Sequence, residues 1–532
     1  MPFHSRISIL FAIIAKNDGN IFIIFAFPST CVNTSASDSQ HHSARRLAGA
    51  GGILMGSQVI GMVLQLLIFS TIQHQLSQAD NGTFFWIQQI SGLAFLIVAE
   101  MGMNSVVIRM YVEHQDNIQQ QNRIMTTFFG LRLGLWLITT LGVCGFALLT
   151  EPDIIRHIVL YAVYLGIAAR GTLFRMVLEI RRRAVNDQML PALAGISDIV
   201  LMSLAVLALR EHLTLWAVMT LFVLTSLPGF IVMLFGDKLW NRSWREFDKP
   251  LAALLLRETA PILVSIVMMQ VQDKCDTIAL NAYFGREALG AFGAIMRVVV
   301  PCISLLMIIS GVIAPVITRL QTADVAQCKQ FVLKGVQWTV LASVLCAVML
   351  GVFAQEILIV TAGRAYQPFA SALVAAAWTL LPGMVVAYLL AILTALGLQR
   401  QALPMMIVLA LGALVGNSIL TATFGIMGSI AARIAATVFA SAVGLWALQR
   451  FLGGGALMVF LRRTVVFVLL VLGVQMLAIH LLRGNVDVLH YSPLLLVLSG
   501  IVIIAVSLLC AFWAGILKRS DIQTLRAVLA SR

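Results

Sequence analysis

The sequence predicts an all-α membrane protein with about 14 transmembrane helices, arranged as two six-helix lobes around a central cavity plus two C-terminal helices. Of the 532 residues, 60% are hydrophobic and only 11% are charged, whereas soluble proteins carry about 25% charged residues. The mean hydropathy is +0.95. Apolar windows alternate with charged loops, which is typical of membrane-spanning helices and not of the period-two strands of a barrel. This composition excludes soluble enzyme folds.

Fourteen apolar segments follow one another from Leu47 onward, and each is long enough to cross a hydrocarbon core. Their approximate limits are 48–71, 83–106, 125–149, 157–178, 190–209, 213–236, 259–281, 288–316, 336–355, 370–396, 403–423, 426–448, 464–482 and 493–516. The preceding residues, 1–46, contain two apolar runs that are each too short to cross a membrane. We interpret 1–46 as an N-terminal extension outside the helical core, which an overlong start of the reading frame would explain. A re-entrant or interfacial segment is the alternative.

Basic residues predict the orientation of the chain. The loops on the side of Arg45 and Arg46 contain 23 Lys and Arg residues, and the opposite loops contain five. Because cytoplasmic loops are enriched in Lys and Arg, both termini are expected in the cytoplasm of a bacterial inner-membrane protein. An odd number of spans would mix the two sets of loops, so this partition supports the count of fourteen. It also explains the net charge of +13 without a nucleic-acid partner.

Two equal halves are predicted within the helical core. Spans one to six form an N-terminal lobe (47–236), a basic cytoplasmic loop follows (237–258), and spans seven to twelve form a C-terminal lobe (259–448). Helices 13 and 14 (449–516) and a cytoplasmic tail (517–532) complete the chain. A weak internal repeat supports this division, because 27 residues separate Gly82 from Arg109 and 29 separate Gly290 from Arg319. Duplicated lobes are typical of transporters, which bind their substrate between the lobes.

The most polar membrane span lies within residues 268–297. Helical spacing places five of its polar residues on one broad face: Gln270, Asp273, Lys274, Thr277 and Asn281. Gln58 and Gln65 share a face of span one. A charge at the bilayer centre costs about 2.5–3.5 kcal/mol on insertion scales, so several in one span predict a face turned to protein or to a watered cavity. The alternative is that Lys274 only neutralises neighbouring carboxylates in a packed bundle.

Eight charged residues are candidates for a polar passage. The predicted cavity cations are Arg170, Lys274, Arg297 and Arg433, and the predicted coupling or cavity carboxylates are Glu100, Asp198, Asp273 and Asp276. Arginine suits phosphate because its donors bind in pairs, and lysine acts as a point charge. A buried carboxylate is also able to carry a proton. Equal numbers of both signs fit a purely structural role as well. Arg433 lies near the outer end of its span, where snorkelling to the interface is an alternative.

Several stretches resemble one family of transporters. They are 76–111, with an acidic turn before a helix that ends at an arginine; 276–297; GRAYQPF at 363–369; and GNSILTATFGIMGSIAARIA at 416–435. Over about 48–516 the chain resembles the polysaccharide flippase branch of the multidrug/oligosaccharidyl-lipid/polysaccharide exporter superfamily. It departs from that pattern because no proline precedes Phe424-Gly425, and because Arg433 replaces a small or apolar residue.

The resemblance implies a function and a set of partners. The expected function is to flip undecaprenyl-diphosphate-linked oligosaccharide from the cytoplasmic to the outer leaflet by alternating access. Expected partners are the lipid-linked substrate, membrane lipid, a polysaccharide polymerase and chain-length proteins. Protons, sodium or downhill flow all remain open as the driving force.

Other functional classes have less support in the sequence. A multidrug efflux antiporter of the same superfamily is the first alternative, and a membrane-embedded glycan transferase or polymerase is the second. A transferase usually has a long outer loop, whereas the outer loops here have about a dozen residues or fewer. We find no P-loop, no HExxH and no nucleophile elbow. The seven cysteines and nine histidines show no metal-ligand spacing. We therefore expect no enzyme activity, no cofactor and no metal.

Overall fold

The computed structural model shows a predominantly helical protein. It describes residues 16–17, 20–21, 56, 60–100, 103–114, 117–150, 189–225, 228–229, 231–232, 247–452, 454–484 and 493–517. The only strands in those ranges are β1 (Lys16–Asn17) and β2 (Asn20–Ile21), which pair antiparallel with Lys16 opposite Ile21 and Asn17 opposite Asn20. The predicted all-α class is confirmed.

The helices before residue 226 form the first part of the fold. Residues 60–75 are helical. They are followed by α2 (Gln78–Ala94), the π-helical η1 (Phe95–Glu100), α3 (Met103–Glu113), α4 (Ile118–Thr150), α7 (Met189–Ala208), the 3-10 turn η3 (Arg210–His212) and α8 (Leu215–Thr225). Predicted span two thus corresponds to α2, η1 and α3 in succession. Predicted span four, 157–178, lies outside the described residues.

The second part of the fold begins with the longest helical element, α10 (Lys249–Ala323). It is followed by α11 (Val325–Val352), α12 (Ala354–Ala362), the 3-10 element η5 (Arg364–Phe369), α13 (Ala370–Ala377), α14 (Leu380–Ala395), α15 (Gln399–Gly416), the π-helical η6 (Asn417–Thr421), α16 (Ala422–Leu452), α17 (Gly454–Gly484) and α19 (Pro493–Trp513). Predicted span ten is therefore divided between α13 and α14.

Glycines interrupt two of the long elements, α10 and α16. Gly285 has φ 75° and ψ −164°, so α10 consists of two helical stretches. Gly425 has φ 58° and ψ −131° within α16. Glycine alone adopts these angles readily, because it has no Cβ. The break at Gly285 confirms the predicted turn between spans seven and eight.

Side chains fix where the helices begin. Asp248 caps α10, since its Oδ1 accepts from the backbone N–H of Leu251 at 3.4 Å. Asp324 caps α11 by accepting from the N–H groups of Ala326 at 2.9 Å and Gln327 at 3.1 Å. Such caps satisfy N–H groups that have no partner within the helix. Asp248 also pairs with Arg123 of α4 at 2.8 Å, which attaches the start of α10 to the first part of the fold.

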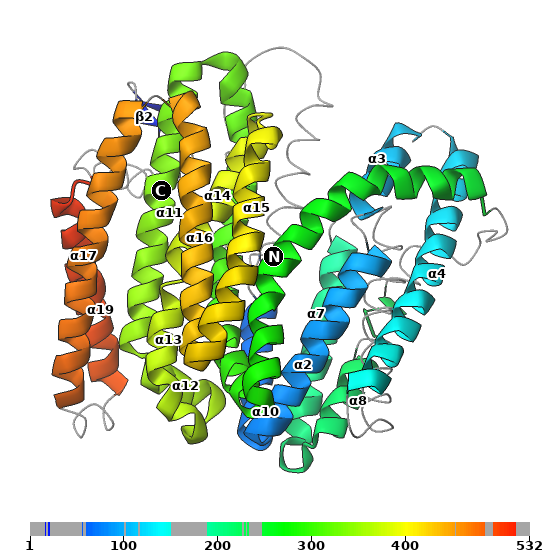
Figure 1. Cartoon of the computed structure of the whole chain (residues 1–532), viewed down its shortest axis with the longest axis horizontal. Helices are drawn as coiled ribbons and strands as arrows, with labels where there is room; N and C mark the ends of the chain where they lie inside the picture. Colours follow the sequence, from blue (N-terminus) through cyan, green and yellow to red (C-terminus); the bar gives the residue numbers. More distant parts are fainter. Residues whose placement is uncertain are drawn as a thin grey trace, which may run out of the picture.

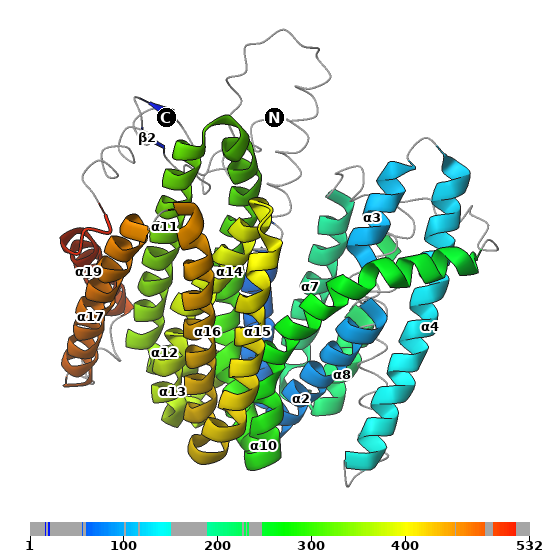
Figure 2. The ribbon, with the colours of Figure 1, turned by 45° about the horizontal axis from the view of Figure 1, so that its top comes forward.

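The helices gather into two groups. Figures 1 and 2 show α2, α3, α4, α7 and α8 on one side and the helices from α11 to α19 on the other, with α10 running from one group to the other. One buried apolar cluster joins them: Phe84 and Ile87 of α2 pack in the same cluster as Phe292 of α10 and Leu373 of α13. A second cluster extends from α10 to the residues just after α19. The domain boundaries proposed from the sequence remain a prediction.

Membrane-spanning helices are abundant among the described residues. Eight helical segments are long and apolar enough to cross a membrane, and two of them, Ile266–Ser304 and Arg400–Leu452, include the breaks at Gly285 and Gly425. A shorter apolar helix covers Leu498–Trp513. Because a helix satisfies its own backbone polar groups in hydrocarbon, such segments identify a multi-pass membrane protein. The count of fourteen stays a prediction.

Two glycines that the internal repeat aligned, Gly82 and Gly290, meet where α2 crosses α10. A Cβ on Gly82 would lie 1.8 Å from the carbonyl oxygen of Arg286, and a Cβ on Gly290 would lie 2.2 Å from that of Gln78. Backbone atoms have no room to move aside, so both positions require glycine for this close helix crossing.

We expect Gly290→Ala to lower the thermal stability of the purified protein, because an extra methyl in a tight contact costs about 1–3 kcal/mol. Gly134→Ala is the matched control, since a Cβ there meets nothing within 4 Å. Melting curves of the two variants in the same detergent provide the measurement. Equal melting temperatures of the two variants would show that α2 and α10 can move apart at this crossing without loss of stability.

Candidate functional site

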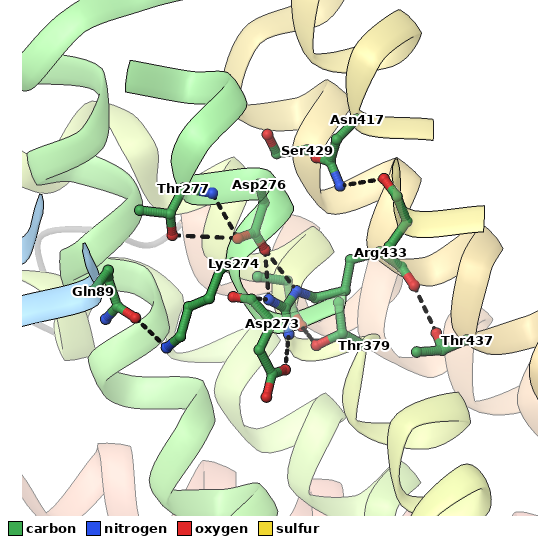
Figure 3. Close-up of polar contacts among 12 residues, drawn as sticks. Gln89, Asp273, Lys274, Asp276, Thr277, Thr379, Asn417, Ser429, Arg433 and Thr437 are labelled. Carbon is green, nitrogen blue, oxygen red and sulfur yellow. Dashed lines mark hydrogen bonds and ion pairs between the residues drawn. The ribbon is translucent and has the colours of Figure 1, made fainter. Parts of the chain in front are cut away.

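The polar face of α10 divides between two neighbouring helices. Asp276 and Thr277 are each only 1% exposed, whereas the Asp273 side chain is 45% exposed. Gln270 and Asn281 are half-buried on the same helix. Figure 3 shows that Asp276 meets Arg433 of α16 while Lys274 extends to Gln89 of α2. The polar residues of this stretch therefore contact two different helices, α16 through Asp276 and α2 through Lys274.

The strongest contact of the site is the ion pair between Asp276 and Arg433. Arg433 donates to Asp276 Oδ2 from Nε at 2.9 Å and from Nη2 at 2.5 Å. Asp276 Oδ1 accepts from the backbone N–H of Thr277 at 2.7 Å and from its hydroxyl at 3.3 Å. The Arg433 side chain is 12% exposed. Snorkelling of Arg433 to the interface is thus wrong, because the guanidinium points inward to a buried carboxylate.

The local fold of residues 416–435 brings Arg433 to this position. The Asn417 amide donates to the Ala413 carbonyl at 2.9 Å, and the Thr421 hydroxyl contacts both Asn417 Oδ1 and Ser429 Oγ at 2.9 Å. A Cβ on Gly428 would lie 1.8 Å from the Leu420 carbonyl. These contacts join the residues on either side of the break at Gly425. They give a physical reason for the asparagine and glycines of the motif identified in the sequence.

Amide side chains of the first group of helices contact two cations of α10. Lys274 Nζ donates to Gln89 Oε1. Arg297 Nη2 donates to Gln88 Oε1 at 3.3 Å. With its amide oriented to suit its neighbours, Gln73 accepts from Arg297 Nη1 at 3.0 Å and donates to the Thr361 carbonyl at 3.1 Å. Gln73, Gln88 and Gln89 were not among the predicted site residues. The adjacent amides Gln88 and Gln89 within an apolar span do, however, indicate a polar site in the sequence.

Three aromatic rings surround the Arg297 guanidinium. Its Cζ lies 4.4 Å from the ring centre of Phe69, 5.3 Å from that of Phe84 and 5.8 Å from that of Phe85. The electron-rich faces of the rings attract the cation. Arg297 is therefore fixed where α2, the helix at 60–75 and α10 meet.

The remaining predicted residues are dispersed or outside the described part. Asp198 of α7 accepts from the backbone N–H of Gly229 at 2.6 Å, which gives it a local structural contact. Gln65 is exposed on the helix at 60–75. Arg170 and Gln58 lie outside the described residues, and only the backbone of Glu100 is described. The structure thus brings together Asp273, Lys274, Asp276 and Arg433 of the eight charged candidates, with Arg297 further along α10.

Arg132 is a buried cation that was not among the site residues predicted from the sequence. Its side chain belongs to α4 and is completely buried. Nη1 donates to Asn104 Oδ1 of α3 at 3.0 Å, and the guanidinium lies 5.3 Å from the centre of the Phe128 ring. Its position within predicted span three (125–149) is the feature of the sequence from which a buried cation could have been predicted. Within the described ranges, no three His, Cys, Asp or Glu side chains are grouped as metal ligands.

Comparisons with known proteins agree on the kind of fold. The family described as "Polysaccharide biosynthesis protein" matches residues 48–321. The structure is similar to the lipid II flippase MurJ in an inward closed conformation, with a TM-score of 0.65, 11% identity, and coverage of 86% of this chain and 98% of that one. No curated protein sequence matches the chain.

Two multidrug transporters are also similar in structure. An inward-facing MATE family transporter of the MOP superfamily has a TM-score of 0.60 and 14% identity, over 73% of this chain and 94% of that one. A mutant form of VcmN, a MATE transporter from Vibrio cholerae, has a TM-score of 0.53 and 15% identity, over 79% of this chain and 100% of the other. At these identities the likeness establishes the transporter fold.

We expect Arg433→Gln to destabilise the purified protein by about 3–5 kcal/mol, because it leaves the Asp276 carboxylate buried without its cation. The double variant Arg433→Gln/Asp276→Asn is expected to regain most of that loss. Melting curves of the single and double variants measure the coupling, with Arg450→Gln as a control on an exposed arginine of the same helix. Additive losses would argue against an ion pair.

Proposed function

Since this chain belongs to the polysaccharide biosynthesis protein family, we propose that it flips undecaprenyl-diphosphate-linked oligosaccharide across the bacterial inner membrane. The repeat unit of an O-antigen or exopolysaccharide would enter from the cytoplasmic leaflet and leave on the outer leaflet. The two groups of helices would alternate in exposing the site, with both termini in the cytoplasm. No catalytic step belongs to this proposal, since the isoprenoid carrier and its sugars stay bonded throughout.

The observation that carries the proposal is the pairing of α10 cations with amide oxygens of the other helix group. Lys274 contacts Gln89, and Arg297 contacts Gln88. An amide oxygen positions a cation without changing its formal charge, so these groups present positive charge between the two groups of helices. A diphosphate requires such charge, because polar groups without partners cost several kcal/mol each in hydrocarbon.

The same contacts explain how a conformational change would expose the site. Gln73, Gln88 and Gln89 belong to the helices before residue 95, and both cations belong to α10. Relative movement of the two elements would separate the amides from the cations. The substrate phosphates would then take the place of the amide oxygens, because an anionic phosphate attracts a cation more strongly than a neutral amide does and binds a guanidinium through paired bonds.

Multidrug efflux is the second candidate, and one observation favours it. The Asp273 carboxylate is 45% exposed, so an organic cation has an anion to approach. One observation argues against drug efflux: the buried Asp276 carboxylate is already paired with Arg433. The cluster of Asp273, Lys274, Asp276 and Arg433 carries two charges of each sign, which suits an organic cation less than an acidic cavity would.

We expect the wild-type chain to restore surface polysaccharide in a strain that lacks its own flippase. Arg297→Gln is expected to reduce the polymer to about one tenth at equal abundance in the membrane, because the loss of one charge-assisted bond is worth about a factor of ten. Arg297→Lys keeps the charge and should retain more polymer.

The matched control for this test is Arg364→Gln, which removes an exposed arginine of η5 and should leave polymer unchanged. If the wild type restores no polymer but confers resistance to cationic dyes, the flippase proposal is replaced by the drug antiporter. If Arg297→Gln restores polymer fully, Arg297 has a packing role only.

A further inference from the structure

Arg433 has two carboxylate partners that differ sharply. Asp276 is 1% exposed and accepts two guanidinium N–H bonds on one oxygen, at 2.9 Å and 2.5 Å. Its other oxygen is held by the backbone and hydroxyl of Thr277. A carboxylate with this many bonds and no access to water is a fixed counter-ion. Asp276 therefore anchors the Nε edge of the guanidinium.

Asp273 is the loose partner. Its Oδ1 lies 3.6 Å from Arg433 Nη1, beyond the range of a good N–H···O bond. Its side chain is 45% exposed, so the carboxylate is far less enclosed than that of Asp276. Only its backbone carbonyl is hydrogen-bonded to Arg433, from Nη2 at 3.3 Å. Exposed ion pairs of this kind are weak, and rotation of the Asp273 side chain would release Nη1 without disturbing the Asp276 pair.

Release of the Asp273 carboxylate would change the charge presented by the site. Arg433 and the adjacent Lys274 would then face a single fixed carboxylate, Asp276, and the Nη1 donors would be available. The diphosphate of the substrate offers more acceptor oxygens than a carboxylate and carries two negative charges where the carboxylate carries one, and guanidinium donors match phosphate geometry. Figure 3 shows the Asp273 carboxylate at the edge of the cluster, away from the buried Asp276.

We propose that Asp273 is an internal anion that occupies Arg433 Nη1 in the empty site, and that a phosphate of the substrate displaces it. This inference rests on the proposed function, because it names the part of the passage that recognises the diphosphate. Asp273 then acts as a specificity-determining residue. A cationic molecule is repelled by the guanidinium, a neutral acceptor brings no charge to replace that of the carboxylate, and a monoanion gains little over the carboxylate already present.

Binding of farnesyl diphosphate to the purified full-length protein tests the inference. Isothermal titration at one fixed low salt concentration would compare the wild type with Asp273→Asn and Asp273→Ala. Removal of the competing anion is expected to tighten binding about tenfold. Glu258→Gln is the matched control, since it removes a partly exposed carboxylate that pairs with Arg109 of α3, and it should leave the affinity unchanged.

Two further probes identify the group that is recognised. Farnesol lacks phosphate and should bind the wild type and Asp273→Asn equally. Inorganic diphosphate should bind more weakly than farnesyl diphosphate but show the same tightening, which assigns the effect to phosphate and not to the isoprenoid. A gain in farnesol affinity on removal of Asp273 would overturn the displacement of an anion.

The outcomes separate this inference from the proposed function. If the wild type binds farnesyl diphosphate and rescues polymer, but Asp273→Asn binds equally or more weakly, the internal-anion role is wrong and the function stands. If no variant binds any diphosphate and the wild type fails to rescue polymer, both are wrong. Size-exclusion profiles of the variants ensure that a loss of binding is not a loss of fold.

Discussion

A carboxylate within a membrane-spanning helix needs a cationic partner, and the Asp276–Arg433 pair meets that constraint. The pair joins α10 to α16, and its two residues are separated by 157 positions in the chain. Because ionised groups are costly to bury, removing either partner exposes the other to the full desolvation cost. This ion pair adds to the apolar packing of α16 against α10, and the rest of the polar site is built beside it.

Gly285 and Gly425 break the two helices that carry this pair. Gly285 divides α10, so that Asp276 lies on its first stretch and Arg297 on its second. Gly425 lies within α16, and the contacts of Asn417, Thr421 and Ser429 hold the residues on either side of it. Both glycines have positive φ, which a residue with a Cβ adopts only under strain. Backbone geometry thus determines which side chains meet.

Charge is distributed unequally around α10. Toward α16 the cations and carboxylates pair with each other, as Arg433 does with Asp276. Toward α2 the cations contact neutral amides, as Lys274 does with Gln89. Ion pairs hold elements together at a high cost of separation, whereas amide contacts are exchanged at less cost. The interface with α2 is accordingly the better place for relative movement of the helices.

The sequence by itself determined the membrane class, most helix positions and the polar character of residues 268–297, because hydrophobic length and helical period are local properties. It also placed Asp273, Lys274, Asp276 and Arg433 among the candidates. Only the tertiary structure decided that Arg433 pairs with Asp276, that Gln88 and Gln89 contact the α10 cations, and that Arg132 is buried. Side chains that are far apart in the chain become partners only when their helices pack together. The pattern of charges along one helix does not specify which residues of other helices lie opposite it.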